Sequence, residues 1–117
     1  MKIAGKLLSG KNAVIVTRSG QRFPAQRFKD WRECIFAQIE QQIGRTPEPV
    51  TVPVKATIRY WPGDRIRRDA PGIIDALWHC LERAGIVADD ALFQAIDYRQ
   101  EALDRANPRA TVTIEAL

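Results

Sequence analysis

Cysteine and histidine are scarce in this sequence. Its 117 residues include two cysteines and one histidine. Cys34 and Cys80 each fall within an apolar helical pattern, which favours two buried, reduced thiols over a disulfide or a metal role. His79 completes no set of ligands at the spacing that zinc sites use. The scarcity of these residues argues against a disulfide-stapled or zinc-stapled domain.

Long apolar runs are also missing. No run approaches the roughly 20 residues that a transmembrane helix needs. The first ten residues contain Lys2 and Lys6 and lack the apolar stretch and cleavage site of a signal peptide. We therefore expect a cytoplasmic protein without a membrane partner. The length, with 45% hydrophobic and 27% charged residues, predicts one globular domain over residues 1–117.

Positive charge is unevenly distributed along the chain, whose formal net charge is +4. Up to Gly44 there are eight Lys or Arg residues against three acidic residues. A second basic cluster leads directly into Asp69 and consists of Arg59, Arg65, Arg67 and Arg68. Basic groups beside carboxylates suit a phosphodiester partner. The alternative interpretation is a solvated basic surface with no such partner.

Two stretches have the three- and four-residue spacing of an amphipathic helix. The first runs from about residue 25 to 43, stops before Gly44, and has on its apolar stripe Phe28, Trp31, Ile35 and Ile39. The second begins near Pro71, ends at Gly85, and has on its stripe Ile74, Leu77, Trp78, Leu81 and Ala84. We expect both tryptophans of these stripes to lie in the core.

Two other stretches, residues 50–60 and 109–117, alternate between apolar and polar residues as half-buried strands do. Pro53 cannot donate a ladder hydrogen bond, so it lies at an edge or before the strand begins. Weaker strands are predicted within residues 1–8 and 95–99, and residues 13–17 form a hairpin or an irregular basic loop. The order predicts an α/β (α+β) domain, a roughly four-stranded sheet with both helices packed on one face.

Four aspartates lie close together in the sequence: Asp69, Asp75, Asp89 and Asp90. Magnesium prefers oxygen ligands and keeps several waters, so two or three carboxylates suffice to hold it. Such an ion polarises a phosphodiester and activates a water for in-line attack. The structural alternatives are that Asp69 caps the second helix, that Asp75 is a solvated surface residue, and that the last two aspartates form a turn.

A resemblance to a known family rests on two segments, Arg67-Arg68-Asp69 and Ala84-Gly85-Ile86-Val87-Ala88-Asp89-Asp90, with a helix between them. They resemble the RusA family of Holliday junction resolvases. That family has R-R-D-x-D-N, a lysine four residues after the second aspartate, and A-G-[apolar]-x-x-D-D. The resemblance implies a homodimer with a mixed sheet that cuts branched DNA with Mg²⁺, or with Mn²⁺ as a substitute.

The sequence departs from the family within the first motif. By the resemblance, the first aspartate falls on Asp69 and the last on Asp90. The family's second aspartate, asparagine and lysine fall on Pro71, Gly72 and Asp75. These departures remove one expected metal ligand and one expected cation from the site.

Positions 71 and 75 share a helical face one turn apart. Our hypothesis is that the missing carboxylate has migrated one turn, so that Asp69, Asp75 and Asp90 hold the metal and act in catalysis, with Asp89 as a supporting ligand. The role of the lysine then passes to Arg68 or Arg99, or is lost. The alternative is a decayed site that still binds DNA.

These considerations predict a structure-selective, Mg²⁺-dependent endodeoxyribonuclease of DNA recombination and repair. The competing predictions are a catalytically inactive junction-binding protein on the same scaffold and a dimeric structural protein without a nucleic-acid partner. The residues expected to contact DNA are Lys11, Arg18, Arg22, Arg65, Arg67, Arg68 and Arg99.

Overall fold

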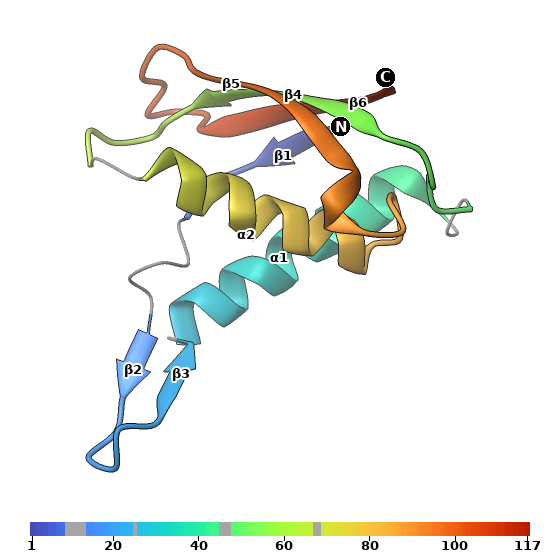
Figure 1. Ribbon diagram of the computed structural model, residues 1–117. Helices are drawn as coiled ribbons and strands as arrows, with labels where there is room; N and C mark the ends of the chain where they lie inside the picture. Colours follow the sequence, from blue (N-terminus) through green and yellow to red (C-terminus); the bar gives the residue numbers. More distant parts are fainter. Residues whose placement is uncertain (9–13, 25, 45–47, 67–68) are drawn as a thin grey trace.

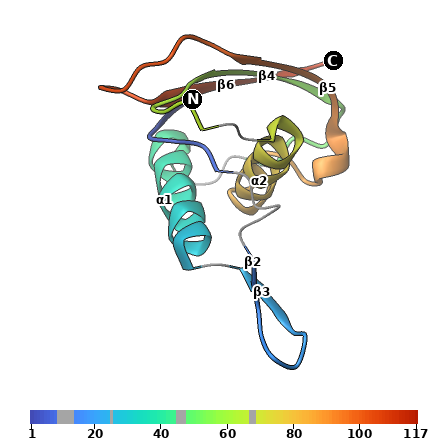
Figure 2. The same ribbon diagram turned by 90° about the vertical axis from the view of Figure 1, so that its left-hand side faces the viewer.

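The computed structural model describes residues 1–117 except 9–13, 25, 45–47 and 67–68, and gives the backbone alone for 14–16 and 22–24. It has a four-stranded sheet with two helices, α1 and α2, packed on one face (Figures 1 and 2). The helices are α1 (Gln26–Ile43) and α2 (Ala70–Arg83). The sheet contains β1 (Lys2–Ala4), β4 (Val54–Trp61), β5 (Phe93–Gln100) and β6 (Arg109–Ala116). The predicted fold class is thus confirmed.

The sheet is mixed and has the strand order β1-β6-β4-β5. β4 pairs antiparallel with β6 and parallel with β5, so β4 is interior and β5 lies at an edge. Pro53 comes directly before β4, which agrees with the second placement predicted for this proline, before the strand begins. The prediction that the strand begins at Val50 is wrong, because Val50 forms only an isolated bridge with Val87, and Val52 is 49% exposed.

The core lies between the sheet and the helices. The alternating residues of β4 that face the helices, including Ile58 and Tyr60, are buried, as are Ile73, Leu77 and Leu81 of α2. Burial of each large apolar side chain stabilises the fold by about 1.5–3 kcal/mol. In the described part of the chain no helix has the length and apolarity needed to cross a membrane.

Three expectations about the core need correction. Ile74 of the predicted α2 stripe is only partly buried and Ile73 takes its place in the core, whereas the other predicted members of the stripe are buried as expected: Leu77, Trp78, Leu81 and Ala84. Trp31 is half-buried, because its indole nitrogen donates to the carbonyl of Lys6 at 2.7 Å near the surface, whereas Trp78 is buried. Cys34 is exposed on α1, and Cys80 alone is a buried thiol.

A hairpin projects from this two-layer body in both views (Figures 1 and 2). It consists of β2 (Val14–Val16) and β3 (Arg22–Pro24), paired antiparallel. Its turn is closed by a hydrogen bond from the Thr17 amide to the Gln21 carbonyl at 2.9 Å, and Gly20 adopts a φ of 83° there. The hairpin alternative is therefore the correct one for this basic segment.

Candidate functional site

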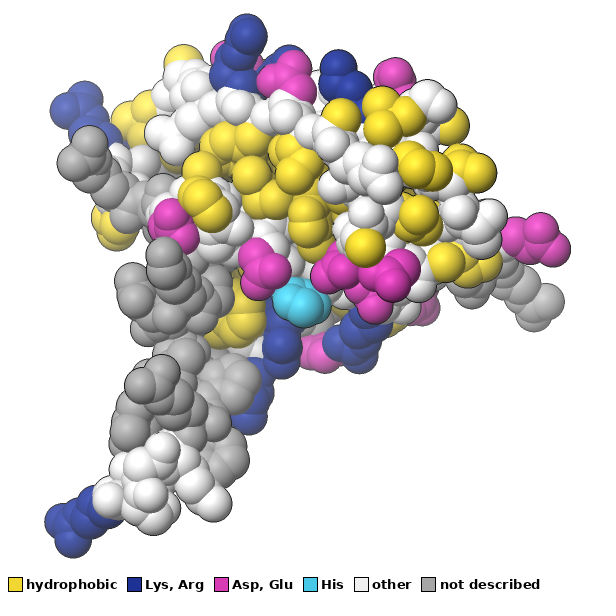
Figure 3. All heavy atoms as spheres, in the orientation of Figure 1, with side chains coloured by type: hydrophobic (Ala, Val, Ile, Leu, Met, Phe, Trp, Pro, Cys, Tyr) yellow, Lys and Arg dark blue, Asp and Glu magenta, His cyan; other side chains and the backbone are white. Residues whose placement is uncertain are grey.

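One face of α2 carries the polar side chains of the candidate site. Asp75, His79 and Glu82 are spaced by four and three residues, which places them on one side of the helix. The apolar side of α2 packs against the sheet, so these three side chains are left exposed. Figure 3 shows the single histidine with acidic side chains on either side of it. The face therefore presents a row of two carboxylates and one imidazole to solvent.

A pocket of about 440 Å³ lies at the start of this face, and Asp69, Asp75 and His79 are among its lining residues. Asp69 is the N-cap of α2, and its Oδ2 accepts a hydrogen bond from the amide of Gly72 at 3.0 Å. His79 Nε2 lies 3.5 Å from Asp75 Oδ2. The structure thus brings Asp69 and Asp75 to one pocket, and the predicted capping by Asp69 is confirmed.

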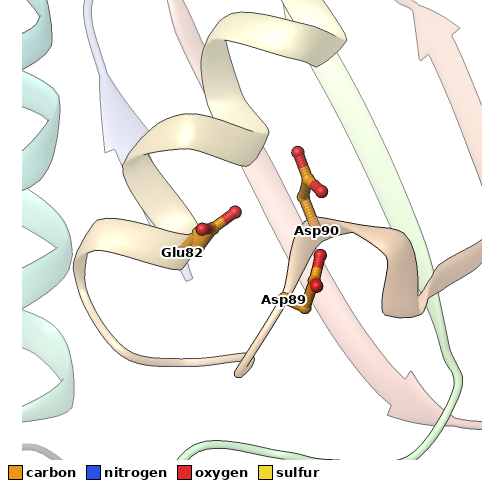
Figure 4. Close-up of side chains that lie close together, drawn as sticks. All are labelled: Glu82, Asp89 and Asp90. Atoms are coloured by element: carbon orange, nitrogen blue, oxygen red, sulfur yellow. The ribbon is translucent and has the colours of Figure 1, made fainter.

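An acidic cluster, made of Glu82, Asp89 and Asp90, lies at the other end of the same face. One carboxylate oxygen from each residue lies within 4.8 Å of those of the other two. In Figure 4 Glu82 extends from the last turn of α2 toward the two aspartates, which stand at the start of the short 3-10 helix η1 (Asp90–Leu92). Asp89 Oδ1 also accepts from the amide of Ala91 at 2.9 Å. Oxygen donors of this kind suit a hard divalent cation.

The four predicted metal ligands are therefore divided between the pocket and the acidic cluster. Asp69 and Asp75 line the pocket, and Asp89 and Asp90 belong to the cluster. Among the described residues, the acidic cluster is the group whose three carboxylate oxygens lie within 4.8 Å of one another. It includes neither Asp69 nor Asp75. A single site built from Asp69, Asp75 and Asp90 stays a prediction.

Sequence reasoning missed Glu82. Its signal was its place seven residues after Asp75, on the same helical face, just before the turn at Gly85. Gly85 has a φ of 77°, a conformation that suits glycine, and the Ile86 amide donates to the Leu81 carbonyl at 3.2 Å. The chain reverses at this turn, and the residues that follow return beside the last turn of α2.

Arg32 of α1 was also missed, although it lines the same pocket as Asp69 and Asp75. Its guanidinium lies over the ring of Phe28, at 5.3 Å from the centroid. Nothing in the local sequence indicates that Arg32 lines this pocket, because Arg32 belongs to α1 and Asp75 belongs to α2. The pocket thus combines two carboxylates, an imidazole and a guanidinium.

The residues predicted to contact DNA occupy different parts of the molecule. Arg18 is exposed in the turn of the β2–β3 hairpin, and Arg65 is exposed in the segment between β4 and α2. Arg99 is exposed on β5, opposite Arg59 in the register, on the sheet face that points away from the helices. Arg22 begins β3. Outside the described residues lie Lys11, Arg67 and Arg68.

Two other basic residues are engaged in ion pairs. Arg59 donates to Asp97 at 3.1 Å, and this hydrogen bond lowers the pKa of the Asp97 carboxyl below its ordinary value. Arg83 donates to Glu33 at 2.6 Å, which likewise lowers the pKa of Glu33. Both pairs lie at the surface, where such contacts contribute little to stability.

No protein-family model matches this chain, and no curated protein matches it. What the site can do must therefore be inferred from its own residues. Carboxylates able to hold a divalent cation lie along one helix face, and a guanidinium lines the pocket at the start of that face. Carboxylates that can hold a metal ion and a nearby guanidinium are groups that can stabilise charge in phosphodiester chemistry.

Proposed function

We propose that the protein is a divalent-metal-dependent endonuclease that acts on branched DNA in the cytoplasm, in the manner of the RusA family that its motif resembles. The observation that carries the proposal is the polar face of α2, where carboxylates lie on both sides of His79 and Arg32 lines the same pocket as Asp69 and Asp75. The mixed sheet with two helices on one face is the fold that the same resemblance implies.

The donor set of the acidic cluster fits a hard cation such as Mg²⁺ or Mn²⁺. Three carboxylate oxygens within 4.8 Å of one another match the oxygen preference of these ions, and their exposed location leaves room for retained waters. Glu82, Asp89 and Asp90 would hold the ion. When bound, it would supply Lewis acidity and a water of lowered pKa. Asp75, 3.5 Å from His79, would orient the imidazole as a proton carrier.

We assign DNA binding to exposed basic residues outside this face. The exposed Arg18 is held away from the body by the hairpin, so it can reach a second arm of a branched duplex (Figure 1). Arg65 is exposed between β4 and α2, near the start of the α2 face. Contacts of this kind neutralise phosphates and release counterions, so binding should weaken steeply with salt.

The proposed enzyme is a homodimer, and the edge of β5 is the surface that we assign to the contact. Among the described residues β5 pairs only with β4, and its Ile96 is 45% exposed. Figure 3 shows apolar side chains exposed between the sheet and the histidine. Antiparallel pairing of two β5 strands about Tyr98 would set Asp97 opposite Arg99 of the partner subunit, which gives charge complementarity at the contact.

Cleavage of a synthetic four-way junction tests the proposal. The wild-type protein, with Mg²⁺ or Mn²⁺, should cut the junction and leave a linear duplex of the same sequence intact. Asp90→Asn should abolish cutting, because one ligand oxygen in three loses its charge. Glu115→Gln, which removes an exposed carboxylate on β6, serves as the matched control and should cut normally.

A second candidate function is junction binding without cleavage. The observation that favours it is that Asp69, which matches the first aspartate of the family's motif, is engaged as a helix cap, while Pro71 occupies the position of the second aspartate. Tight, salt-sensitive junction binding without metal-dependent cutting would favour this candidate over the nuclease.

A further inference from the structure

One residue that lines the pocket at the start of the α2 face, Arg32, has a buried polar atom without a partner among the described residues. This atom is the Nε of its guanidinium. A buried donor that lacks a partner costs free energy, and the cost is larger when the group is charged. Arg32 therefore has a capacity to donate hydrogen bonds that the described part of the chain does not use.

Arg83, the arginine of α2, differs from Arg32 because its guanidinium has an acceptor within the chain. Arg83 makes two hydrogen bonds to the carboxylate of Glu33, at 2.6 and 3.4 Å. Within the described residues, the Arg32 guanidinium lies over the ring of Phe28 and forms no ion pair. Arg32 thus keeps its charge and its planar fork of N–H donors available to a ligand in the pocket.

We propose that Arg32 binds a phosphate group of the nucleic-acid backbone in this pocket. A guanidinium presents paired N–H donors that match two phosphate oxygens, and its contact with an aromatic ring holds its plane in place. A pocket of about 440 Å³ is within the usual range for small ligands. Figure 3 shows basic side chains directly below the histidine, on the side away from the sheet.

The two carboxylates of the pocket should make phosphate binding depend on Mg²⁺. Asp69 and Asp75 repel an anion in the same pocket, so phosphate should bind Arg32 more tightly when Mg²⁺ in solution screens these two carboxylates. This inference rests on the proposed function and deepens it. In this proposal Arg32, from α1, provides positive charge in a pocket where Asp69 and Asp75 are negative.

His79 provides a direct probe of this pocket. It is the single histidine of the chain, and it lines the pocket together with Arg32. In an untagged protein its imidazole Hε1 proton therefore gives one proton NMR signal that needs no assignment. Thymidine 5′-monophosphate is titrated against the protein at low salt and constant Mg²⁺. Thymidine without the phosphate is titrated in parallel.

Three variants accompany the wild-type protein. Arg32→Gln removes the charge, and Arg32→Lys keeps the charge but not the fork. Lys55→Gln removes a charge on the opposite face of the sheet, where Lys55 is exposed on β4. We expect a saturable shift of the His79 signal in the wild type and Lys55→Gln, binding at least about tenfold weaker in Arg32→Gln, and intermediate binding in Arg32→Lys.

Three results would overturn the inference: no shift with the nucleotide in the wild type, an equal shift with thymidine, or unchanged affinity in Arg32→Gln. Circular dichroism checks the fold of each variant. If Arg32→Gln does not fold, Arg32→Lys and the wild type decide the outcome. Junction cleavage separates the two proposals. Cleavage that survives Arg32→Gln removes the role of Arg32 alone, whereas phosphate binding without any cleavage removes the nuclease alone.

Discussion

A carboxylate oxygen of Glu82 lies within 4.8 Å of one from Asp90, although Glu82 belongs to the last turn of α2 and Asp90 begins η1. The reversal of the chain at Gly85 creates this approach, and Asp89 completes the group. Three carboxylates at this range repel one another and offer oxygen donors to a cation. A divalent cation would relieve that repulsion, so the affinity of the cluster for metal can be measured through stability.

Glu82→Gln should abolish or strongly reduce stabilisation by metal. A ligand present at 100 times its Kd stabilises the native state by about 2.7 kcal/mol, so the wild-type Tm should rise on addition of Mn²⁺ or Mg²⁺. In the variant the rise should be lost, because one ligand oxygen has become an amide. Without metal the variant should be at least as stable as the wild type, since one repulsive charge is gone.

Glu115→Gln is the control for this measurement, because it removes a carboxylate from the exposed surface of β6. Its Tm should respond to metal as the wild type does. A full response in Glu82→Gln would show that the cluster is not a metal site.

Two substitutions of Asp69 separate its structural from its chemical contribution. Asp69→Ala removes the oxygen that accepts from Gly72 and should lower the free energy of unfolding by about 1 kcal/mol. Asp69→Asn keeps a capping oxygen, so its free energy of unfolding in urea should fall less than that of Asp69→Ala. If Asp69 also binds metal, Asp69→Asn should nevertheless lose junction cleavage. Normal cleavage by Asp69→Asn would limit Asp69 to capping.

Removing Arg18 should weaken junction binding in a salt-dependent way. Each phosphate neutralised contributes about −0.9 to the slope of log affinity against log salt on duplex DNA, so Arg18→Gln should reduce the magnitude of that slope by about 1. Fluorescence anisotropy at several salt concentrations measures the slope. Lys55→Gln, on the other side of the molecule, should leave it unchanged, and an unchanged slope in Arg18→Gln would remove the hairpin from the DNA interface.

Local periodicity explains why most of the fold could be predicted. Both helices and the paired strands β4 and β6 follow from patterns that repeat within one element. The errors fall where an element's phase or end is set by distant contacts. Val50 alternates with its neighbours, yet it bonds to the segment after α2, through the carbonyl of Ile86 at 3.0 Å. Cys34 lies next to the apolar stripe of α1 and outside the core.

The candidate site was only partly accessible from the sequence. Asp69, Asp75, Asp89 and Asp90 could be proposed because motif spacing in one short segment points to them. Arg32 could not be found in this way, because its place beside Asp69 depends on how α1 packs against α2. Tertiary packing brings together residues from different elements, and spacing within one segment does not predict such a combination.

Ile96→Lys should prevent self-association if the edge of β5 forms the dimer contact. Ile96 is 45% exposed on a strand that has one partner among the described strands, so a lysine there should leave the fold intact and place charge in the contact. Light scattering after gel filtration should give a dimer for the wild type and a monomer for the variant. Leu103→Lys, at a loop residue that is 36% exposed, is the control. A variant that stays dimeric would place the contact elsewhere.

The two cysteines should differ sharply in reactivity. Burial raises the pKa of the Cys80 thiol to about 11, whereas Cys34 is exposed on α1. The thiolate is the reactive form, and at pH 8 about one Cys80 thiol in a thousand is ionised. Iodoacetamide at pH 8 should therefore label the native protein at Cys34 alone, and mass spectrometry should find no label on native Cys34→Ser until urea unfolds it.

The raised pKa of Cys80 predicts that the free energy of unfolding decreases at alkaline pH. An unfolded Cys80 ionises near pH 8.5 to 9, well below the pKa of about 11 in the folded protein. The unfolded state therefore loses its proton first, so the contribution of the neutral thiol to stability is complete below pH 8 and declines as pH rises toward 11. Cys80→Ala should flatten this decline in urea unfolding curves, with Cys34→Ala as the matched control. An equal decline in both variants would show that Cys80 does not ionise in this manner, because Cys34 has no comparable burial to lose.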